Sequence, residues 1–135
     1  MNVEISLGDT IVEEEVLKLY RANEWSSSEK PTQLMAALRG SHALVTARVA
    51  GELVGLGNAI SDGHLVVYFP HMLVLPRVQG HGIGRKMMEA FLGKYRSFHQ
   101  LILTADGRAV EFYKQLGFER AGLTEPMWIY AGTEH

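Results

Sequence analysis

The chain has 135 residues, 47% of them hydrophobic and 21% charged, with a formal net charge of −2. This length predicts one domain over residues 1–135 with a buried core, and the composition excludes wholesale disorder. The charge balance argues against nucleic acid or an anionic membrane as a partner. Cysteine is absent, which excludes disulfides, thiolate nucleophiles and cysteine-bound metals. Without a signal-peptide pattern or an apolar run of ~20 residues, we expect a soluble, cytoplasmic protein that needs no metal.

The first half of the chain predicts strands and helices in alternation. Apolar and polar residues alternate early, which is typical of a half-buried strand. The expected elements are a strand over residues 2–7, a helix capped by Asp9 or Thr10, a helix over 31–38, and a hairpin of strands over 42–49 and 52–60.

The second half predicts a long strand, a crossover helix and a set of shorter elements. Pro70 lies inside the strand expected over 64–75, so we expect a bulge or an unpaired stretch there. The other expected elements are a helix ending near Tyr95, a strand over 101–105, a helix over 108–116, and closing strands over 118–120 and 127–130. Antiparallel hairpins followed by a crossover predict an α/β (α+β) fold with a mixed sheet of about six or seven strands and about four helices, in the order βααβββαβαβ.

A glycine-rich turn separates the long strand from the crossover helix. Its sequence is Gln79-Gly80-His81-Gly82-Ile83-Gly84-Arg85. Such a turn can present several backbone N–H groups beside a helix N-terminus, which suits a pyrophosphate. A Walker A loop is excluded because Lys-Ser/Thr does not follow Gly84, and the Gly-x-Gly-x-Gly spacing does not match a dinucleotide fingerprint. The alternative is a strand-to-helix turn that only requires small residues.

Three motifs in order resemble the GCN5-related N-acetyltransferase (GNAT) superfamily. The family pattern Gln/Arg-x-x-Gly-x-Gly/Ala is matched by Gln79, Gly82 and Gly84, and the pattern Leu-x-Val-x-Pro by residues 72–76 with Met72 in first place. The family's Asn-x-x-Ala-x-x-Phe-Tyr-x-x-x-Gly-Phe is matched by Asp106, Ala109, Phe112, Tyr113, Gly117 and Phe118. The resemblance covers residues 52–118 and is strongest to small stand-alone bacterial members.

The resemblance implies the GNAT fold and transfer of the acetyl group of acetyl-CoA to a primary amine of a small molecule, by direct attack in a ternary complex. It implies that the cofactor is held by Met72, Leu73, Val74, Gln79, Gly80, His81, Gly82, Ile83, Gly84, Arg85, Asp106 and Tyr113. Arg85 or Arg77 could meet the 3′-phosphate, or both could be solvated. Asp106 stands where the family has Asn; an ionised Asp cannot donate, so it could cap the following helix instead.

The resemblance also implies three catalytic residues. Tyr113 would be the general acid for the leaving thiolate, with an aromatic packing role as the alternative. His71 is the candidate general base, since an imidazole titrates near neutral pH, and Tyr68 would position a water or the substrate. A backbone N–H near Leu73 or Val74 would meet the developing oxyanion. His71 could equally be a structural or solvent-facing histidine.

Acceptor and partners are open at this level. An aromatic rim from Trp25 and Trp128 would favour an arylalkyl or other small amine, and an acidic rim from Glu24, Glu29 or Glu125 would favour a cationic amine or lysine. A homodimer formed through the closing strands is a further expectation from the family. The alternatives to a small-molecule enzyme are a protein or peptide amine acetyltransferase and a non-catalytic acyl-CoA-binding regulatory module.

Overall fold

The computed structural model describes residues 1–133 and contains a six-stranded mixed sheet with four α-helices in that part of the chain. The elements are β1 (Val3–Leu7), α1 (Glu13–Ala22), the short 3-10 helix η1 (Ser26–Glu29), α2 (Pro31–Arg39), β2 (Ala43–Val49), β3 (Glu52–Ser61), β4 (Val66–Tyr68), β5 (Met72–Val74), the 3-10 helix η2 (Pro76–Val78), α3 (Ile83–Tyr95), β6 (Gln100–Ile102) and α4 (Ala109–Gln115). The predicted fold class is confirmed.

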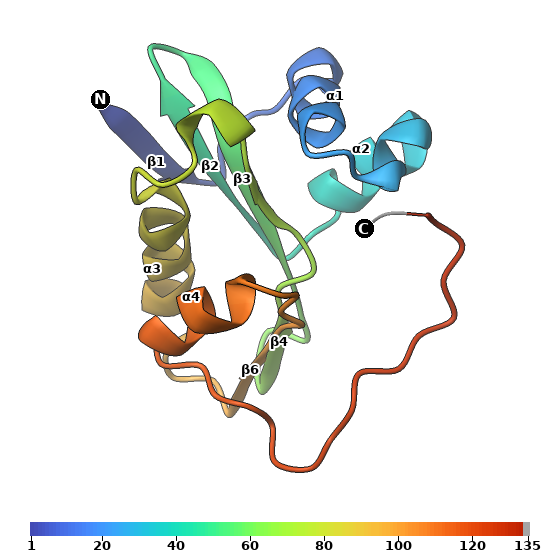
Figure 1. Cartoon of the computed structure of the whole chain (residues 1–135), viewed down its shortest axis with the longest axis vertical. Helices are drawn as coiled ribbons and strands as arrows, with labels where there is room; N and C mark the ends of the chain where they lie inside the picture. Colours follow the sequence, from blue (N-terminus) through green and yellow to red (C-terminus); the bar gives the residue numbers. More distant parts are fainter. Residues whose placement is uncertain (134–135) are drawn as a thin grey trace.

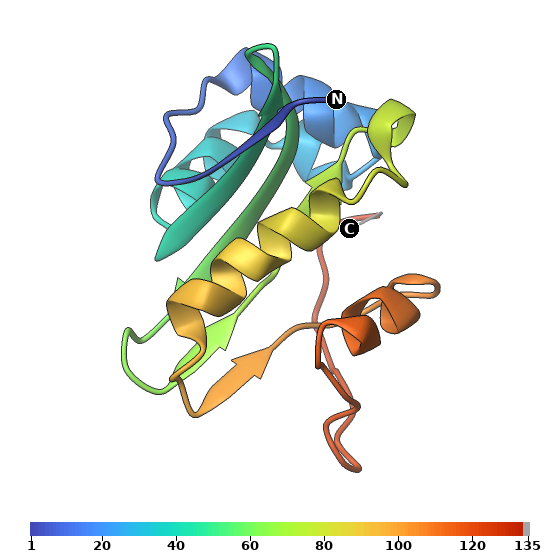
Figure 2. The same ribbon diagram turned by 90° about the vertical axis from the view of Figure 1, so that its left-hand side faces the viewer.

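The strand order in the sheet is β1-β2-β3-β4-β6. Strand β5 also pairs with β3, nearer the start of β3 than β4 does. Among the strands of residues 1–133, only the β4–β6 pair is parallel; the other pairs are antiparallel. Helices α1 and α2 cover one face of the sheet and α3 covers the other (Figures 1 and 2). The apolar stripe of α3, which includes Met87, Phe91 and Tyr95, is fully buried against the sheet.

Two glycines in the central strand β3 allow this close packing. A Cβ on Gly55 would lie 2.7 Å from the Met87 sulfur of α3, and one on Gly57 would lie 2.6 Å from Cε of Met72 in β5. Both distances are shorter than real Cβ contacts. These glycines therefore give β3 a smooth surface on its α3 side, against which Met87 and Met72 pack.

The long strand expected over 64–75 is split in two, as Pro70 predicts. Strand β4 ends at Tyr68 and β5 begins at Met72, so Phe69, Pro70 and His71 form a break. The Phe69 N–H still donates to the Ile102 carbonyl at 3.1 Å, and the His71 N–H donates to Oδ1 of Asn58 at 3.0 Å. Before the break, β4 pairs with both β3 and β6. After the break, the described pairing of β5 is with β3 alone. The sheet therefore opens between β5 and β6.

The predicted cap of α1 by Asp9 or Thr10 is wrong. Helix α1 begins after Val12, whose N–H donates to Oε2 of Glu15 at 3.1 Å. Asp9 instead accepts hydrogen bonds from Thr46 and Arg48 of β2, each at 2.8 Å. A partly buried cation on the neighbouring strand competes for the carboxylate more strongly than helix N–H groups do, because charge-assisted hydrogen bonds are the stronger ones.

The two predicted closing strands are not formed. Residues 118–133 contain no strand, and they run as an extended segment away from the sheet before returning toward η1 (Figure 1). A strand needs a neighbouring strand to bond to, and this segment does not lie along the open edge of β6. The strand-forming composition of Met127–Tyr130 was therefore insufficient to predict its structure.

Candidate active site

The glycine turn leaves an accessible patch of backbone at the start of α3. Gly80 and Gly82 have φ values of 84° and 79°, a left-handed conformation that side chains disfavour. A Cβ built on either residue meets nothing within 4 Å, so the space beside the turn is open. The next residue, Ile83, is buried and fixes the helix to the sheet. The turn thus presents its N–H groups at the positive end of α3 without side chains in the way.

The predicted loop residue Gln79 turns its side chain back to the sheet. Its Nε2 donates to the Val74 carbonyl at 3.0 Å. Nδ2 of Asn23, the residue that ends α1, donates to the same carbonyl at 3.2 Å. Asn23 was missed by the sequence analysis, since its position predicts only a helix end. Together the two amides join α1, β5 and the glycine turn.

The pairing of β5 with β3 decides which of its backbone groups face the opening. The Asn58 N–H donates to the His71 carbonyl at 3.0 Å, and the Leu75 N–H donates to the Val54 carbonyl at 2.8 Å. Hydrogen-bonded pairs alternate in an antiparallel ladder, so the backbone groups of Leu73 also face β3. Those of Met72 and Val74 face away from β3. Of the two residues predicted to meet an oxyanion, only Val74 thus has its N–H on the open edge.

The charged residues around the turn pair mainly with one another. Arg77 forms a salt bridge with Glu52 of β3, and Arg85 lies 3.2 Å from Glu89, one helical turn along α3. His81 is exposed at the tip of the turn. The two arginines are therefore exposed and ion-paired, and neither is committed to a phosphate by its contacts.

His71 lies in an aromatic group built from α1 and the following loop. Its Nδ1 is 2.7 Å from the hydroxyl oxygen of Tyr20. The Trp25 ring stands edge-on to the imidazole at a centroid distance of 5.0 Å and to Tyr20 at 5.7 Å. Tyr20 is fully buried, and burial raises the pKa of its hydroxyl well above the usual range. The sequence analysis does not place Tyr20 in the site.

The break at Pro70 changes which candidates share a face of the sheet. Phe69 stacks on Phe91 of α3 at 5.1 Å, so Tyr68 points to the opposite face. His71 also points to that face, since it contacts Tyr20 of α1. In an unbroken strand, residues 68 and 71 would lie on opposite faces. The break therefore brings His71, the candidate base, and Tyr68, the candidate positioning residue, to the α1 side of the sheet.

Tyr113 lies in α4 and is partly buried between Phe112 and Phe118, at centroid distances of 4.9 and 5.7 Å. Burial raises the pKa of Tyr113, so its phenol stays protonated at neutral pH. Helix α4 is placed against α3 by Phe112, whose ring would be 3.4 Å from a Cβ on Gly84. This contact gives Gly84 a packing role as well as a place in the motif.

The N-cap position of α4 is occupied by Arg108, two residues after Asp106. The helix begins behind Arg108, which makes no side-chain capping bond. Asp106 contributes its backbone carbonyl, which accepts from the Ala109 N–H at 3.0 Å.

A family model for the GNAT acetyltransferase domain matches residues 9–126. The chain belongs to the GNAT acetyltransferase family. A GNAT-family acetyltransferase from Streptococcus pneumoniae TIGR4 is 30% identical in sequence, with a TM-score of 0.84 over 96% of this chain and 99% of that one. The predicted membership of the GNAT superfamily and the predicted acetyltransferase class are confirmed.

Curated plant relatives share only part of their length with this GNAT domain. The chain is 36% identical over 70 residues to the histone acetyltransferase TAP1 of Glycine max, covering 50% of this chain and 30% of that protein. It is 34% identical over 70 residues to the chloroplastic GCN5-related N-acetyltransferase 2 of Arabidopsis thaliana, covering 50% and 27%. The chain thus spans less than a third of either relative.

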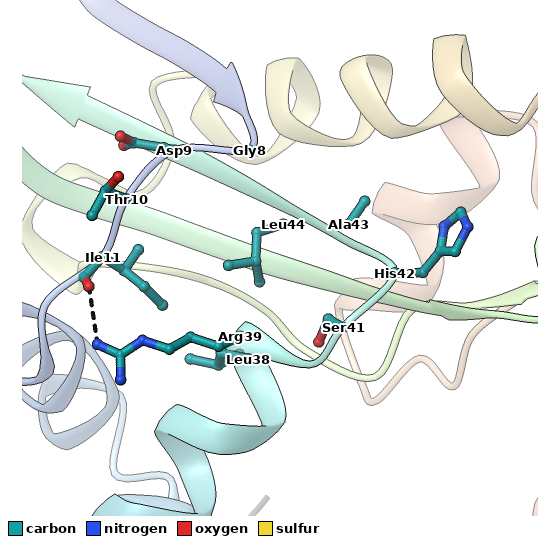
Figure 3. Close-up of a pocket in the computed structure, with 10 residues that line it drawn as sticks. All are labelled: Gly8, Asp9, Thr10, Ile11, Leu38, Arg39, Ser41, His42, Ala43 and Leu44. Atoms are coloured by element: carbon teal, nitrogen blue, oxygen red, sulfur yellow. Dashed lines mark hydrogen bonds between the residues drawn. The ribbon is translucent and has the colours of Figure 1, made fainter.

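A pocket of about 370 Å³ lies apart from the glycine turn, β5 and α4. Figure 3 shows it between the β1–α1 connection, the end of α2 and the start of β2. It contains none of the predicted site residues. Its Arg39 donates to the Ile11 carbonyl, and Ser41 donates to the Ala37 carbonyl, so these polar groups stabilise the fold.

Within residues 1–133, no helix is long and apolar enough to cross a bilayer, and no cluster of three potential metal ligands is found.

Proposed function

We propose that the protein is an acetyl-CoA-dependent N-acetyltransferase that acetylates a primary amine of a small molecule in a ternary complex. The observation that carries this proposal is the edge of β5, whose outward-facing backbone groups lie beside the open glycine turn. Acetyl-CoA supplies a thioester carbonyl, which a neutral amine attacks to form an amide and release the thiol. The turn residues 79–84 would hold the pyrophosphate, and the peptide-like pantetheine arm would lie along the edge of Met72 and Val74 and pair with the outward-facing backbone of Met72.

Val74 is the proposed donor to the carbonyl oxygen. Its N–H faces the opening, whereas its carbonyl is already occupied by Asn23 and Gln79. These two amides hold the residue in place before substrate arrives, and a donor that needs no reorganisation stabilises developing charge most effectively.

Tyr113 is the proposed proton donor to the leaving sulfur. The raised pKa of its phenol keeps the proton in place at neutral pH but makes full transfer to a thiolate less favourable. Tyr113 therefore first donates a hydrogen bond to the sulfur as negative charge develops on it, and the proton follows as the carbon–sulfur bond breaks and the thiol leaves. The contacts of Asp106 and Arg85 with the cofactor stay predictions.

His71 is the proposed base and Tyr68 the residue that positions water or amine. With Nδ1 held by Tyr20, the ring exchanges a proton through Nε2. A neutral ring accepts a proton there only in the tautomer whose Nδ1–H donates to the Tyr20 oxygen. Tyr20→Phe should then lower kcat nearly as much as His71→Ala, and both should alter the acidic limb of the pH–rate profile. Unchanged profiles in both variants would remove His71 from the mechanism.

The aromatic group of Tyr20, Trp25 and His71 favours an amine with an apolar body. A protein amine is the second candidate, supported by the similarity to the Glycine max histone acetyltransferase.

We propose a second copy of this chain as a further partner, since large apolar residues after α4 are exposed. A cytoplasmic site of action stays a prediction from the cysteine-free composition.

Calorimetric titration with acetyl-CoA, run beside a free-thiol release assay, tests the function. The panel should include arylalkylamines, polyamines, aminoglycosides and a histone-tail peptide. We expect micromolar binding and thiol release with a small amine that carries an apolar group. Release with the peptide alone would favour the protein-directed enzyme, and binding without release on any amine would favour the regulatory module.

A further inference from the structure

Asn58 is a buried amide in the interior of the central strand β3, although asparagine is depleted in strands. Its side chain is only 4% exposed, and apart from tyrosine the only other buried polar residue within residues 1–133 is Thr46 of β2. Thr46 donates to Asp9 and so belongs to the cluster around Arg48. A buried amide destabilises a fold unless its hydrogen bonds are made. The partners of Asn58 lead to the candidate base.

The break between β4 and β5 contains one extra residue. Ile60 of β3 pairs with Tyr68 of β4, and Gly57 of β3 pairs with Met72 of β5. Between these two pairs β3 has two residues, whereas the opposite segment has three, residues 69–71. An extra residue of this kind is a β-bulge, which disrupts the ladder and re-aims the side chains beside it. The last of the three is the candidate base, so its backbone needs partners outside the regular ladder.

Asn58 supplies both of those partners. Its backbone N–H donates to the His71 carbonyl, and its side-chain Oδ1 accepts from the His71 N–H, each at 3.0 Å. The other end of the amide, Nδ2, donates to Oγ of Ser41 at 3.0 Å. Ser41 donates its own hydroxyl proton to the Ala37 carbonyl of α2, so its oxygen is the acceptor. A flipped amide would place a donor against the His71 N–H, and therefore only one orientation of Asn58 satisfies both ends.

We propose that Asn58 is a positioning residue for His71, which rests on the function proposed above. Tyr20 of α1 holds the ring of His71 through Nδ1 at 2.7 Å, but this bond does not fix the backbone of the bulge. Asn58 fixes that backbone from β3, so the imidazole is set from both ends. Displacing a reacting group by about 1 Å can lower a rate on the order of 100-fold. Asn58 therefore acts on catalysis through His71, without touching the substrate.

Substitutions at Asn58 separate positioning from stability. Asn58→Leu removes the acceptor for the His71 N–H and keeps a side chain of similar size. We expect kcat to fall about tenfold or more, with KM for acetyl-CoA changed by less than about threefold. Asn58→Asp keeps an acceptor, and on the high-pH plateau, where His71 is neutral, it should retain kcat within about threefold of native. Equal losses of kcat in Asn58→Leu and Asn58→Asp would overturn the proposal.

Thr46→Val is the matched control, because it removes a hydrogen bond from the other buried polar residue. Its kcat should stay within about twofold of native, and a loss equal to that of Asn58→Leu would reduce both residues to structural roles. A double-mutant cycle adds Asn58→Leu to His71→Ala, and the further loss of kcat should be less than about twofold because the positioned residue is gone. Losses that multiply would overturn the proposal.

Amide hydrogen exchange measures the positioning without any turnover. In the native protein the His71 amide should exchange at least about tenfold more slowly than exposed loop amides. Asn58→Leu should remove this protection and shift the ¹⁵N signals of the His71 ring, whereas Thr46→Val should preserve both. A fast-exchanging His71 amide in the native protein, or ring signals unchanged by Asn58→Leu, would overturn the proposal.

The exchange measurement on the native protein applies even if Asn58→Leu does not fold. It also keeps this proposal distinct from the proposed function. A protein with a protected His71 amide that acetylates no amine would contradict the proposed function, whereas an active protein with an unprotected His71 amide would contradict the role of Asn58.

Discussion

The body formed by residues 1–102 and the C-terminal region from 103 to 133 differ sharply in packing. Every fully buried apolar residue of the described chain lies between Ile11 and Tyr95. After Tyr95 the apolar side chains are at best partly covered, although α4 carries three aromatic or aliphatic residues of the motif.

This difference divides the candidate site into two parts. The glycine turn, Asn23 and β5 belong to the well-packed body, whereas Tyr113 belongs to the thinly packed region. Apart from the predicted cofactor contacts of Asp106 and Tyr113, binding of acetyl-CoA should therefore be insensitive to changes after residue 103, while the rate of acetyl transfer should respond to them. Local stability commonly varies across one domain in this way.

The largest expected effect is on the free energy of unfolding, when a phenylalanine is replaced by alanine in the body and, for comparison, in the C-terminal region. Phe91→Ala removes a fully buried ring from α3 and should cost about 3–5 kcal/mol of unfolding free energy. Phe118→Ala removes a partly buried ring and should cost about 1 kcal/mol. Urea denaturation measures both. Equal costs would mean that the C-terminal region is packed as tightly as the body.

The next largest effect is expected for Tyr113→Phe. Removing the phenol oxygen should lower kcat about 100-fold, equivalent to about 2.7 kcal/mol of barrier. Acetyl-CoA affinity by calorimetry and the melting temperature should barely change, because the ring and its contacts remain. Phe112→Leu, which alters packing but no proton donor, is the control. Equal kcat in native protein and Tyr113→Phe would leave Tyr113 with a packing role only.

Arg48→Met should destabilise the body by about 2 kcal/mol, because it leaves two carboxylates without their cation. Arg48 lies 2.8 Å from both Asp9 and Glu15, and these hydrogen bonds lower the pKa of each carboxyl. Groups with lowered pKa stabilise the fold above their unfolded value of about 4, and that contribution is lost as the pH falls further.

The native protein should therefore lose stability between about pH 4 and pH 2 more steeply than Arg48→Met. Thermal melts over this range measure the difference. Lys18→Met, which breaks an exposed salt bridge to Glu52, should change the melting temperature little at any pH. Parallel pH curves for the native protein and Arg48→Met would contradict the assigned role of the cluster.

The smallest expected changes in stability come from replacing two glycines by alanine, one at the start of α3 and one in its interior. Gly82→Ala forces a side chain into a left-handed conformation, costing about 1–2 kcal/mol and weakening acetyl-CoA binding about tenfold. Gly93→Ala lies in the interior of α3 with open space around it, and should stabilise the protein by about 0.5–1 kcal/mol. Unchanged acetyl-CoA affinity in Gly82→Ala would remove this turn from the binding site.

Much of the fold was predictable because its signals are local. The stripe of α3 repeats every four residues, the turn at 79–84 is marked by its own glycines, and Pro70 predicts the break in its strand. Contacts between distant segments were not predictable in this way. Tyr20 and His71 are 51 positions apart, as are Asn23 and Val74. Nothing in the sequence around one member of such a pair indicates the other. The predicted cap by Asp9 was wrong for the same reason, because its partner Arg48 lies 39 positions away in the sequence.

The amino-acid sequence alone determined the order of the elements as far as α4, the helical apolar face and an open glycine turn, because each follows from neighbouring residues. Only the tertiary structure decided that Tyr68 and His71 share a face, that Val74 rather than Leu73 turns its N–H outward, and that residues 127–130 form no strand. Each of these three outcomes depends on which element lies beside the residue in the folded chain. A backbone group faces a partner strand or an opening, and a strand-forming segment without a partner strand remains extended chain.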